Sequence, residues 1–97
     1  MPEFTVSVGR CSQTNDVVVA DASVSRQHLL LTIDSVNAIR VQDRQSAYGS
    51  FFWDGQQWQP FQQITLSAND YIVIGKTKLR LMELIIAYQI RSRSESL

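Results

Sequence analysis

The sequence has a single cysteine and a single histidine among its 97 residues. One cysteine cannot form a disulfide within the chain, which excludes a fold stabilised by internal disulfides. One cysteine and one histidine also provide too few of the usual ligands for a buried structural zinc site. We therefore expect neither a metal nor another cofactor.

The chain also lacks net charge, because nine Lys and Arg residues balance nine Asp and Glu residues. Proteins that bind nucleic acid through bulk electrostatics carry an excess of positive charge, so we expect no nucleic-acid partner, although neutrality permits a local basic cluster. No apolar run approaches the roughly 18 residues of a membrane helix. The start, Met1-Pro2-Glu3-Phe4, has neither the basic nor the apolar region of a signal peptide. These absences favour a cytoplasmic, intracellular protein with no membrane insertion.

What the chain does have is enough apolar sequence for one core, since 44% of its residues are hydrophobic. We expect a single domain over residues 1–90 and a flexible, serine-rich tail or linker over residues 91–97. Short apolar or alternating stretches recur every 8–12 residues or so, a spacing typical of an all-β sandwich or barrel. The expected strands are 4–8, 17–20, 28–33, 39–42, 51–53, 58–61, 63–66, 71–74 and a last one that begins at residue 79.

The apolar segment 83–90 fits two structures equally well. Helical spacing places Leu81, Leu84, Ile85 and Tyr88 on one face. Strand spacing instead places Met82, Leu84, Ile86, Tyr88 and Ile90 on one face. The pattern alone leaves helix and strand open.

Four motifs follow one another along the chain. They are Val8-Gly9-Arg10 with Asn15-Asp16-Val17-Val18-Val19, then Val24-Ser25-Arg26-Gln27-His28, then the segment from Asp43 to Ser50, and finally Asn69-Asp70-Tyr71-Ile72-Val73-Ile74-Gly75. Each motif is weak alone, but their order and spacing resemble the forkhead-associated (FHA) domain family over roughly residues 6–82. The resemblance implies an antiparallel β-sandwich whose loops at one end bind a phosphothreonine peptide.

The resemblance assigns the phosphopeptide site to three loops. Arg10 is the implied main phosphate ligand, because a guanidinium can form two parallel bonds to phosphate oxygens. Ser25 would donate its hydroxyl to the phosphate, and Arg26 would add a further contact. The remaining implied contacts come from the third loop, at Ser46, Ala47 and Tyr48. The implied partner is a Thr-phosphorylated protein or peptide, such as the substrate of a Ser/Thr kinase.

Other residues of these motifs are expected to support the site. In the family, the histidine at the position of His28 braces the loops from behind. Gly9 and Gly49 are expected where a side chain would clash or where φ is positive. Asp43 and Ser50 complete this supporting set.

Two departures from the family pattern motivate an alternative function. Tyr48 stands where the family usually has an Asn that holds the peptide backbone, and Ala47 lacks a hydroxyl. The family usually has about two strands before its Gly-Arg strand, and we expect this chain to lack them. The alternative is a phosphate-independent scaffold or assembly domain, as in a secretion or signalling complex. The apolar segment 84–90 would cover the open sheet edge, within one chain or across a homodimer.

An enzyme is the third alternative, because Ser25, His28 and Asp43 are the residue types of a hydrolase triad. However, Ser25 and His28 lie three residues apart with no nucleophile-elbow glycine pattern around the serine. The sequence therefore predicts a binding module with no catalytic residue.

Overall fold

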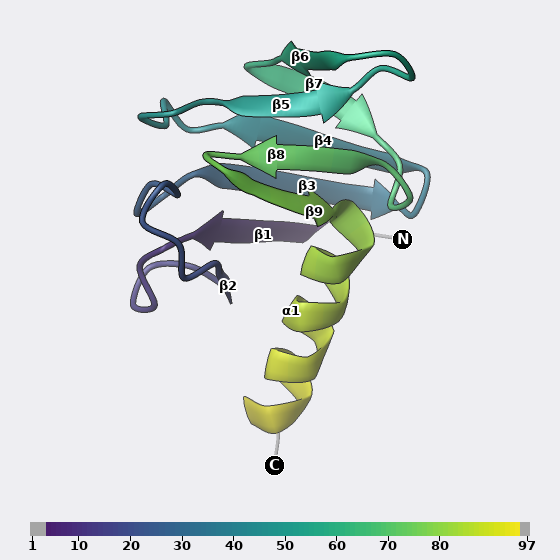
Figure 1. Cartoon of the computed structure of the whole chain (residues 1–97). Helices are drawn as coiled ribbons and strands as arrows, with labels where there is room; N and C mark the ends of the chain where they lie inside the picture. The colour runs from purple at the N-terminus through teal and green to yellow at the C-terminus, as the bar shows by residue number, and fades with distance from the viewer. Residues whose placement is uncertain (1–3, 96–97) are drawn as a thin grey trace.

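The structure, a computed structural model, describes residues 4–95, and side chains are described over residues 4–91. Nine strands form two stacked sheets, followed by one helix (Figure 1). The strands are β1 (Phe4–Gly9), β2 (Val17–Val18), β3 (Leu29–Ser35), β4 (Ala38–Asp43), β5 (Ser50–Trp53), β6 (Trp58–Pro60), β7 (Gln63–Leu66), β8 (Tyr71–Ile74) and β9 (Thr77–Arg80). The fold is thus the expected β-sandwich, with a C-terminal helix, α1 (Leu81–Glu95).

The larger sheet has the order β2-β1-β3-β4-β7 and the smaller has the order β6-β5-β8-β9. All neighbouring strands are antiparallel except β1 and β2, which run parallel through two residue pairs. Strands β5 and β6 form a hairpin at Asp54-Gly55, because Trp53 pairs with Trp58 across it. Successive side chains of a strand point to opposite faces of the sheet, so one set lies between the two sheets and the other set faces solvent.

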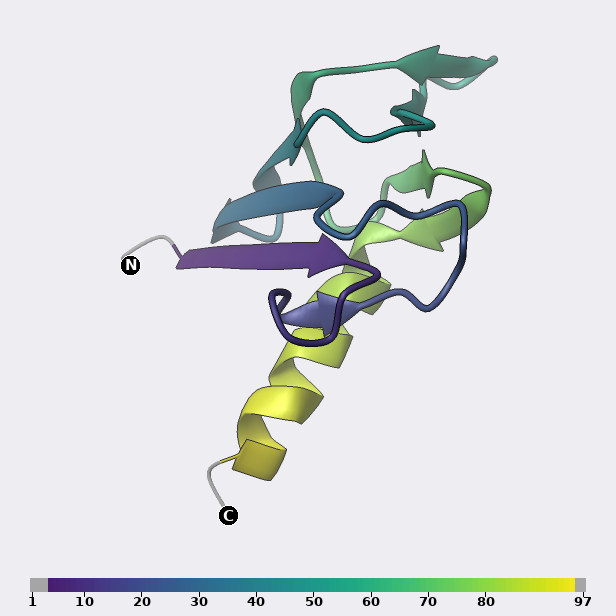
Figure 2. The same ribbon diagram turned by 90° about the vertical axis from the view of Figure 1, so that its left-hand side faces the viewer.

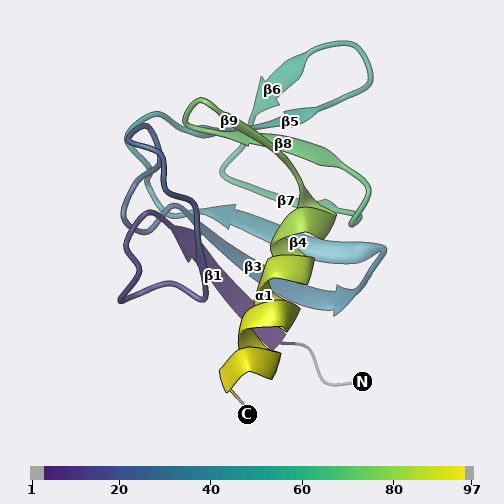
Figure 3. The same cartoon turned by 60° about the horizontal axis from the view of Figure 1, so that its bottom comes forward.

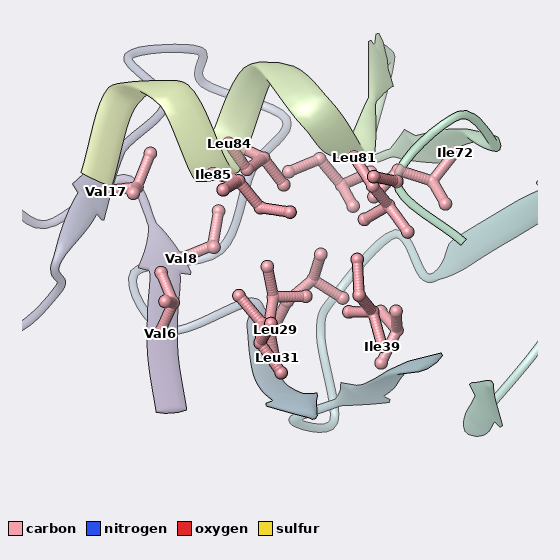
Figure 4. Packing of buried hydrophobic residues seen from close by; sticks show 14 of the residues in the cluster. Val6, Val8, Val17, Leu29, Leu31, Ile39, Ile72, Leu81, Leu84 and Ile85 are labelled. Carbon is pink, nitrogen blue, oxygen red and sulfur yellow. The ribbon is translucent and has the colours of Figure 1, made fainter. Parts of the chain in front are cut away.

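The core fills the space between the two sheets. Most of its fully buried side chains come from β1, β3 and β4 of the larger sheet and from β8 of the smaller one, among them Val6, Val8, Leu29, Leu31, Ile39, Val41, Ile72 and Ile74. Figure 4 shows Val8, Leu29 and Ile72 on the side of the core that faces Leu81, Leu84 and Ile85 of α1. Burial of this continuous apolar surface is the main stabilising term of the fold.

Segment 83–90, which fits both helix and strand spacing in the sequence, belongs to the helix α1. Leu81, Leu84 and Ile85 lie on one helical face and are buried in the core, whereas Ile86 on the other face is 45% exposed. Tyr88 stacks on Phe4 of β1 with ring centroids 5.7 Å apart. The helix lies across one open side of the sandwich, next to β9 and β1 (Figures 1 and 3). The segment therefore covers this side within one chain, as one branch of the sequence hypothesis proposed.

Three strands differ from the sequence prediction by two residues at one end, and four others differ by one residue at one or both ends. The second strand ends at Val18 rather than at residue 20, because Val19 leaves the strand after its N–H donates to Gly9 O at 3.0 Å. The third strand begins at Leu29 and runs on to Ser35, because the turn that follows needs only two residues. The last strand begins at Thr77 and ends at Arg80, because Leu81 already starts the helix that buries its side chain.

The proposed domain boundary after residue 90 falls within α1. The side chain of Arg91 donates through Nη1 to the backbone oxygens of Asn15 and Asp16, at 2.9 and 3.0 Å. Residues 96 and 97 of the expected tail lie outside the described residues. Within residues 4–95, no helical segment combines the length and the apolar character needed to cross a membrane.

Candidate functional site

Three loops that carry the sequence motifs lie at the same end of the sandwich. They connect β1 to β2, β2 to β3, and β4 to β5, and Figure 2 looks onto this end of the molecule. The β8–β9 turn lies there too, since Lys76 N donates to Ser23 Oγ of the β2–β3 loop at 2.8 Å. Loops held by a rigid sheet are a common place for binding residues.

Arg10 stands where β1 ends, and the β2–β3 loop fixes both its backbone and its side chain. Its backbone N–H donates to Ser25 O at 3.0 Å, and its Nε donates to Val24 O at 3.0 Å. The side chain is otherwise exposed. The Nε bond orients the guanidinium and leaves its two terminal nitrogens for a ligand, which is the geometry that a bidentate phosphate contact needs.

Ser25 connects the β2–β3 loop to the β4–β5 loop. Its Oγ accepts the backbone N–H of Ala47 at 2.9 Å. A hydroxyl that accepts one bond still carries its own O–H donor. The contact thus leaves Ser25 able to donate to an anion, and it brings Ala47 into the site through its backbone.

His28 lies behind these loops and is fully buried. Its Nδ1 accepts the backbone N–H of Ser25 at 3.0 Å, and its Nε2 lies 3.0 Å from Gly49 O. These two partners assign the neutral tautomer with the proton on Nε2. Burial lowers the pKa of His28 below its usual value, against the opposing effects of the Gly49 oxygen and of Asp43. The imidazole is therefore a neutral brace between two loops.

Asp43 organises the β4–β5 loop from the end of β4. Its carboxylate accepts bonds from Ser46 N and Ser46 Oγ, at 2.9 and 2.6 Å, and from Ser50 Oγ at 2.5 Å. Burial opposes ionisation of Asp43, but the hydrogen bonds from Ser46 and Ser50 outweigh it and hold the pKa of this carboxyl below its usual value. The hydroxyl of Ser46 donates to Asp43 and supports the loop, and a contact of Ser46 with a peptide stays a prediction.

Gly9 and Gly49 occupy positions where a side chain would strain the loops. A Cβ on Gly9 would lie 2.2 Å from Arg26 O and 2.8 Å from Asn15 Nδ2, which is a steric clash. Gly49 has a φ of 83°, in the left-handed region that glycine adopts without strain. Each glycine keeps one loop against its neighbour.

Asn15 is the supporting residue for which the sequence analysis named no role. It is 5% exposed, and its Nδ2 donates to Arg26 O at 2.6 Å and to Cys11 O at 2.8 Å. It therefore holds the β1–β2 loop against the β2–β3 loop. An Asn in a polar loop has no pattern that distinguishes this role from a solvated turn residue.

The exposed surface of the site is basic. Arg10, Arg26 and Arg44 are exposed at this end, and none of them forms an ion pair with a carboxylate among the side chains of residues 4–91. Tyr48 of the β4–β5 loop is 62% exposed. Guanidinium groups without a carboxylate partner, together with the hydroxyl of Ser25, are suited to bind a doubly charged anion.

The arrangement does not form a hydrolase triad. The ring of His28 contacts the backbone N–H of Ser25, while the Ser25 hydroxyl is bonded to Ala47. Asp43 lies 3.9 Å from Nε2, the nitrogen that a triad uses for the nucleophile. Within residues 4–95, no group of three His, Cys, Asp or Glu side chains is placed to hold a metal ion.

Comparison with known families gives one family match. The sequence model described as "FHA domain" matches residues 6–75, which are most of the chain and contain all four motifs. A curated relative, an FHA domain-containing protein of Arabidopsis thaliana, is 29% identical over 85 residues. Those residues are 88% of this chain but only 22% of the relative, so the chain spans about a fifth of that protein's length.

Solved structures give the same match. The FHA domain of the CT664 protein from Chlamydia trachomatis superposes with a TM-score of 0.67 and 34% identity, covering 77% of this chain and 72% of that one. Mycobacterium tuberculosis EmbR, solved in complex with a low-affinity phosphopeptide, superposes with a TM-score of 0.63 and 27% identity. This second match covers 76% of this chain and 18% of EmbR.

Proposed function

The chain belongs to the forkhead-associated (FHA) domain family, and we propose that it binds a protein or peptide phosphorylated on threonine. The phosphate would lie between Arg10, Ser25 and Arg26. Arg10 would supply a bidentate contact through its terminal nitrogens, Ser25 its hydroxyl proton, and Arg26 a further positive charge. Tyr48 and the backbone of Ala47 would face the peptide next to the phosphate.

The observation that carries the proposal is the way in which Arg10 and Ser25 are held. Their backbones are bonded to each other at 3.0 Å, and the guanidinium is oriented by Val24 O before any ligand arrives. An oriented side chain loses less entropy on binding. The phosphopeptide complex of EmbR, a structurally similar protein, supports the same ligand class.

The expected contribution of Arg10 follows from the strength of hydrogen bonds to charged groups. Each such bond contributes about 1.5–3 kcal/mol, so loss of even one of the Arg10 bonds should weaken phosphopeptide binding by roughly 10- to 150-fold. Arg10→Lys keeps the charge but removes both the two-nitrogen geometry and the Nε bond to Val24 O. We expect it to recover only a small part of this affinity.

The test is a fluorescence-anisotropy titration of a degenerate Thr-phosphorylated peptide pool against the wild type, Arg10→Ala, Arg10→Lys and Ser25→Ala. Arg40→Ala is the matched control, because Arg40 is an exposed arginine in the middle of β4 and lies outside the three loops. The thermal unfolding midpoint of each variant checks that it is folded. Unchanged affinity in folded Arg10→Ala would overturn the assignment of the phosphate site.

A phosphate-independent assembly domain is the second candidate function. The observation in its favour is Tyr48, whose largely exposed ring stands where the family usually places a peptide-holding Asn. This candidate predicts equal binding of phosphorylated and unphosphorylated partners, and partners that Arg10→Ala does not release.

The finer features of the partner are also proposals. We propose that the phosphothreonine protein is a substrate of a Ser/Thr kinase, that the module acts in the cytoplasm and that it has no catalytic activity of its own. Association of two copies through the exposed side of α1, where Ile90 is 60% exposed, would appear as a concentration-dependent sedimentation coefficient.

A further inference from the structure

A second surface with the features of a binding site lies on the outer face of the smaller sheet. Strand pairing places Trp53 opposite Trp58 and Tyr71 opposite Arg80, on the side of the smaller sheet opposite to buried Ile72. Lys78 lies on the same face of β9. We call these five residues the aromatic patch. In Figure 1 this part of the smaller sheet lies at the end of the sandwich away from the three loops.

The aromatic patch is hollow and partly open to solvent. Trp53 and Trp58 meet edge to face with ring centroids 5.3 Å apart, yet they remain 42% and 36% exposed. Together with Tyr71 and Lys78 they line a pocket of about 400 Å³. That volume is within the range of ligand pockets and suits one or two side chains of a partner.

The charged side chains of the aromatic patch indicate the sign of the charge that its ligand should carry. Lys78 Nζ lies 5.1 Å from the centre of the Tyr71 ring, and the Arg80 guanidinium lies 4.8 Å from it and donates to the Tyr71 hydroxyl. Two cations already use the ring of Tyr71, which disfavours a cationic ligand such as a methylated lysine.

The nearby carboxylates do not neutralise these cations. Asp54 accepts bonds from the backbone of Gln56 and Gln57 and from the Gln59 side chain within its own hairpin, and Glu83 accepts from the backbone of Arg80. No ion pair of Lys78 or Arg80 with a carboxylate is found among the side chains of residues 4–91. The aromatic patch therefore presents two positive charges that a partner can complement.

We propose that the aromatic patch binds an acidic, proline-containing segment of a partner protein. Proline-rich segments are already extended before binding and dock in grooves lined by aromatic side chains. A proline ring would enter the pocket between Trp53 and Trp58, and flanking Asp or Glu residues would pair with Lys78 and Arg80. A single-stranded nucleic acid could also stack on such rings, but two cations on a chain of zero net charge are few for a phosphate backbone.

The chain provides its own reporter for this site, because both of its tryptophans belong to the aromatic patch. The experiment is an NMR titration of the full chain that follows the two indole N–H signals. The probe is a pool of 12-residue peptides with one central proline and Asp or Glu at half of the other positions. Three controls are used: the same pool with Lys or Arg at the acidic positions, the pool with Ser in place of proline, and oligo(dT).

The proposal predicts saturable shifts of both indole signals with the acidic proline pool only. Lys78→Glu should weaken this binding by about tenfold or more, as expected for reversal of a charge at an interface. Arg40→Glu is the matched control, since it makes the same charge change on the larger sheet. Lys78→Gln serves as a second variant if Lys78→Glu is unstable. Phosphothreonine binding should be the same in all of these variants, so the two sites are tested separately.

Several results would overturn the proposal. They are equal binding of the basic pool, binding that survives replacement of proline, a response to oligo(dT) alone, or indole shifts that follow protein concentration without peptide. The last result would assign the aromatic patch to contact between two copies of this chain.

Discussion

Replacement of His28 tests whether the neutral imidazole holds the site together. In His28→Ala, the backbone N–H of Ser25 loses its acceptor, which costs about 1–3 kcal/mol for an unsatisfied buried donor. Loss of the hydrogen bond to Gly49 O costs less, about 0.5–1.5 kcal/mol. Gly49 O still accepts a hydrogen bond from the backbone N–H of Gly75 at 3.2 Å. The cavity left by a fully buried ring adds about 1 kcal/mol or more.

The sum is about 2.5–5.5 kcal/mol, a large part of the roughly 5–15 kcal/mol that stabilises a domain. Two smaller changes separate the contributions. His28→Asn keeps an acceptor near the position of Nδ1, and His28→Gln keeps a donor near the position of Nε2. The backbone N–H of Ser25 has no second acceptor, whereas the carbonyl of Gly49 has a second donor. His28→Asn should therefore destabilise the fold less than His28→Gln.

The assay is urea unfolding followed by tryptophan fluorescence, at pH 7 and at pH 5. Because burial lowers the folded-state pKa of His28, its stabilisation is complete above the unfolded value of about 6.5 and declines as the pH falls from there towards the folded value. The wild type should therefore lose more stability than His28→Asn between pH 7 and pH 5. A folded His28→Ala protein destabilised by less than about 1 kcal/mol would refute the reasoning.

Three further predictions concern the support of the loops and of the core. Gly9→Ala should destabilise the fold by about 2 kcal/mol or more in urea unfolding, because its Cβ would overlap Arg26 O, and a change within about 0.5 kcal/mol would contradict the close approach. Leu84→Ala should cost about 2–5 kcal/mol in the same assay, while Ile86→Ala on the exposed side of α1 should cost far less; equal effects would contradict the packing of the helix. Asp43 has a lowered pKa, so its stabilisation is present above the unfolded value of about 3.9 and is lost as the pH falls through the lower folded value. Asp43→Asn should reduce the slope of stability against pH in acid titrations below about pH 4, and an unchanged slope would assign that acid sensitivity to other carboxyls.

Much of the sandwich could be predicted because most strands have one solvated face. Alternation in β1 and β4, together with turn residues such as Asp54-Gly55, indicates both the strands and their connections. The segment 83–90 could not be assigned, because its apolar residues satisfy helical and strand spacing alike. The choice depends on tertiary packing, since Leu84 and Ile85 reach the core only when they lie on one helical face.

The sequence predicted which residues belong to the candidate site better than it predicted where their side chains point. The residues that line it, Arg10, Ser25 and Arg26, come from motifs, and the structure brings their loops together. The direction of a side chain depends on the geometry of the folded loop, which residue type alone does not determine. Thus residue type alone does not show that the Ser46 hydroxyl donates to Asp43, or that Asn15 is a buried link between two loops.

The most direct test of the central claim is the affinity of the wild-type chain for three peptide pools of matched sequence. One pool is phosphorylated on threonine, one on serine, and one is unphosphorylated. We expect saturable binding of the phosphothreonine pool that weakens as salt rises, since guanidinium groups would hold the phosphate. Equal affinity for the phosphothreonine and unphosphorylated pools would contradict the claim and would favour the phosphate-independent assembly domain.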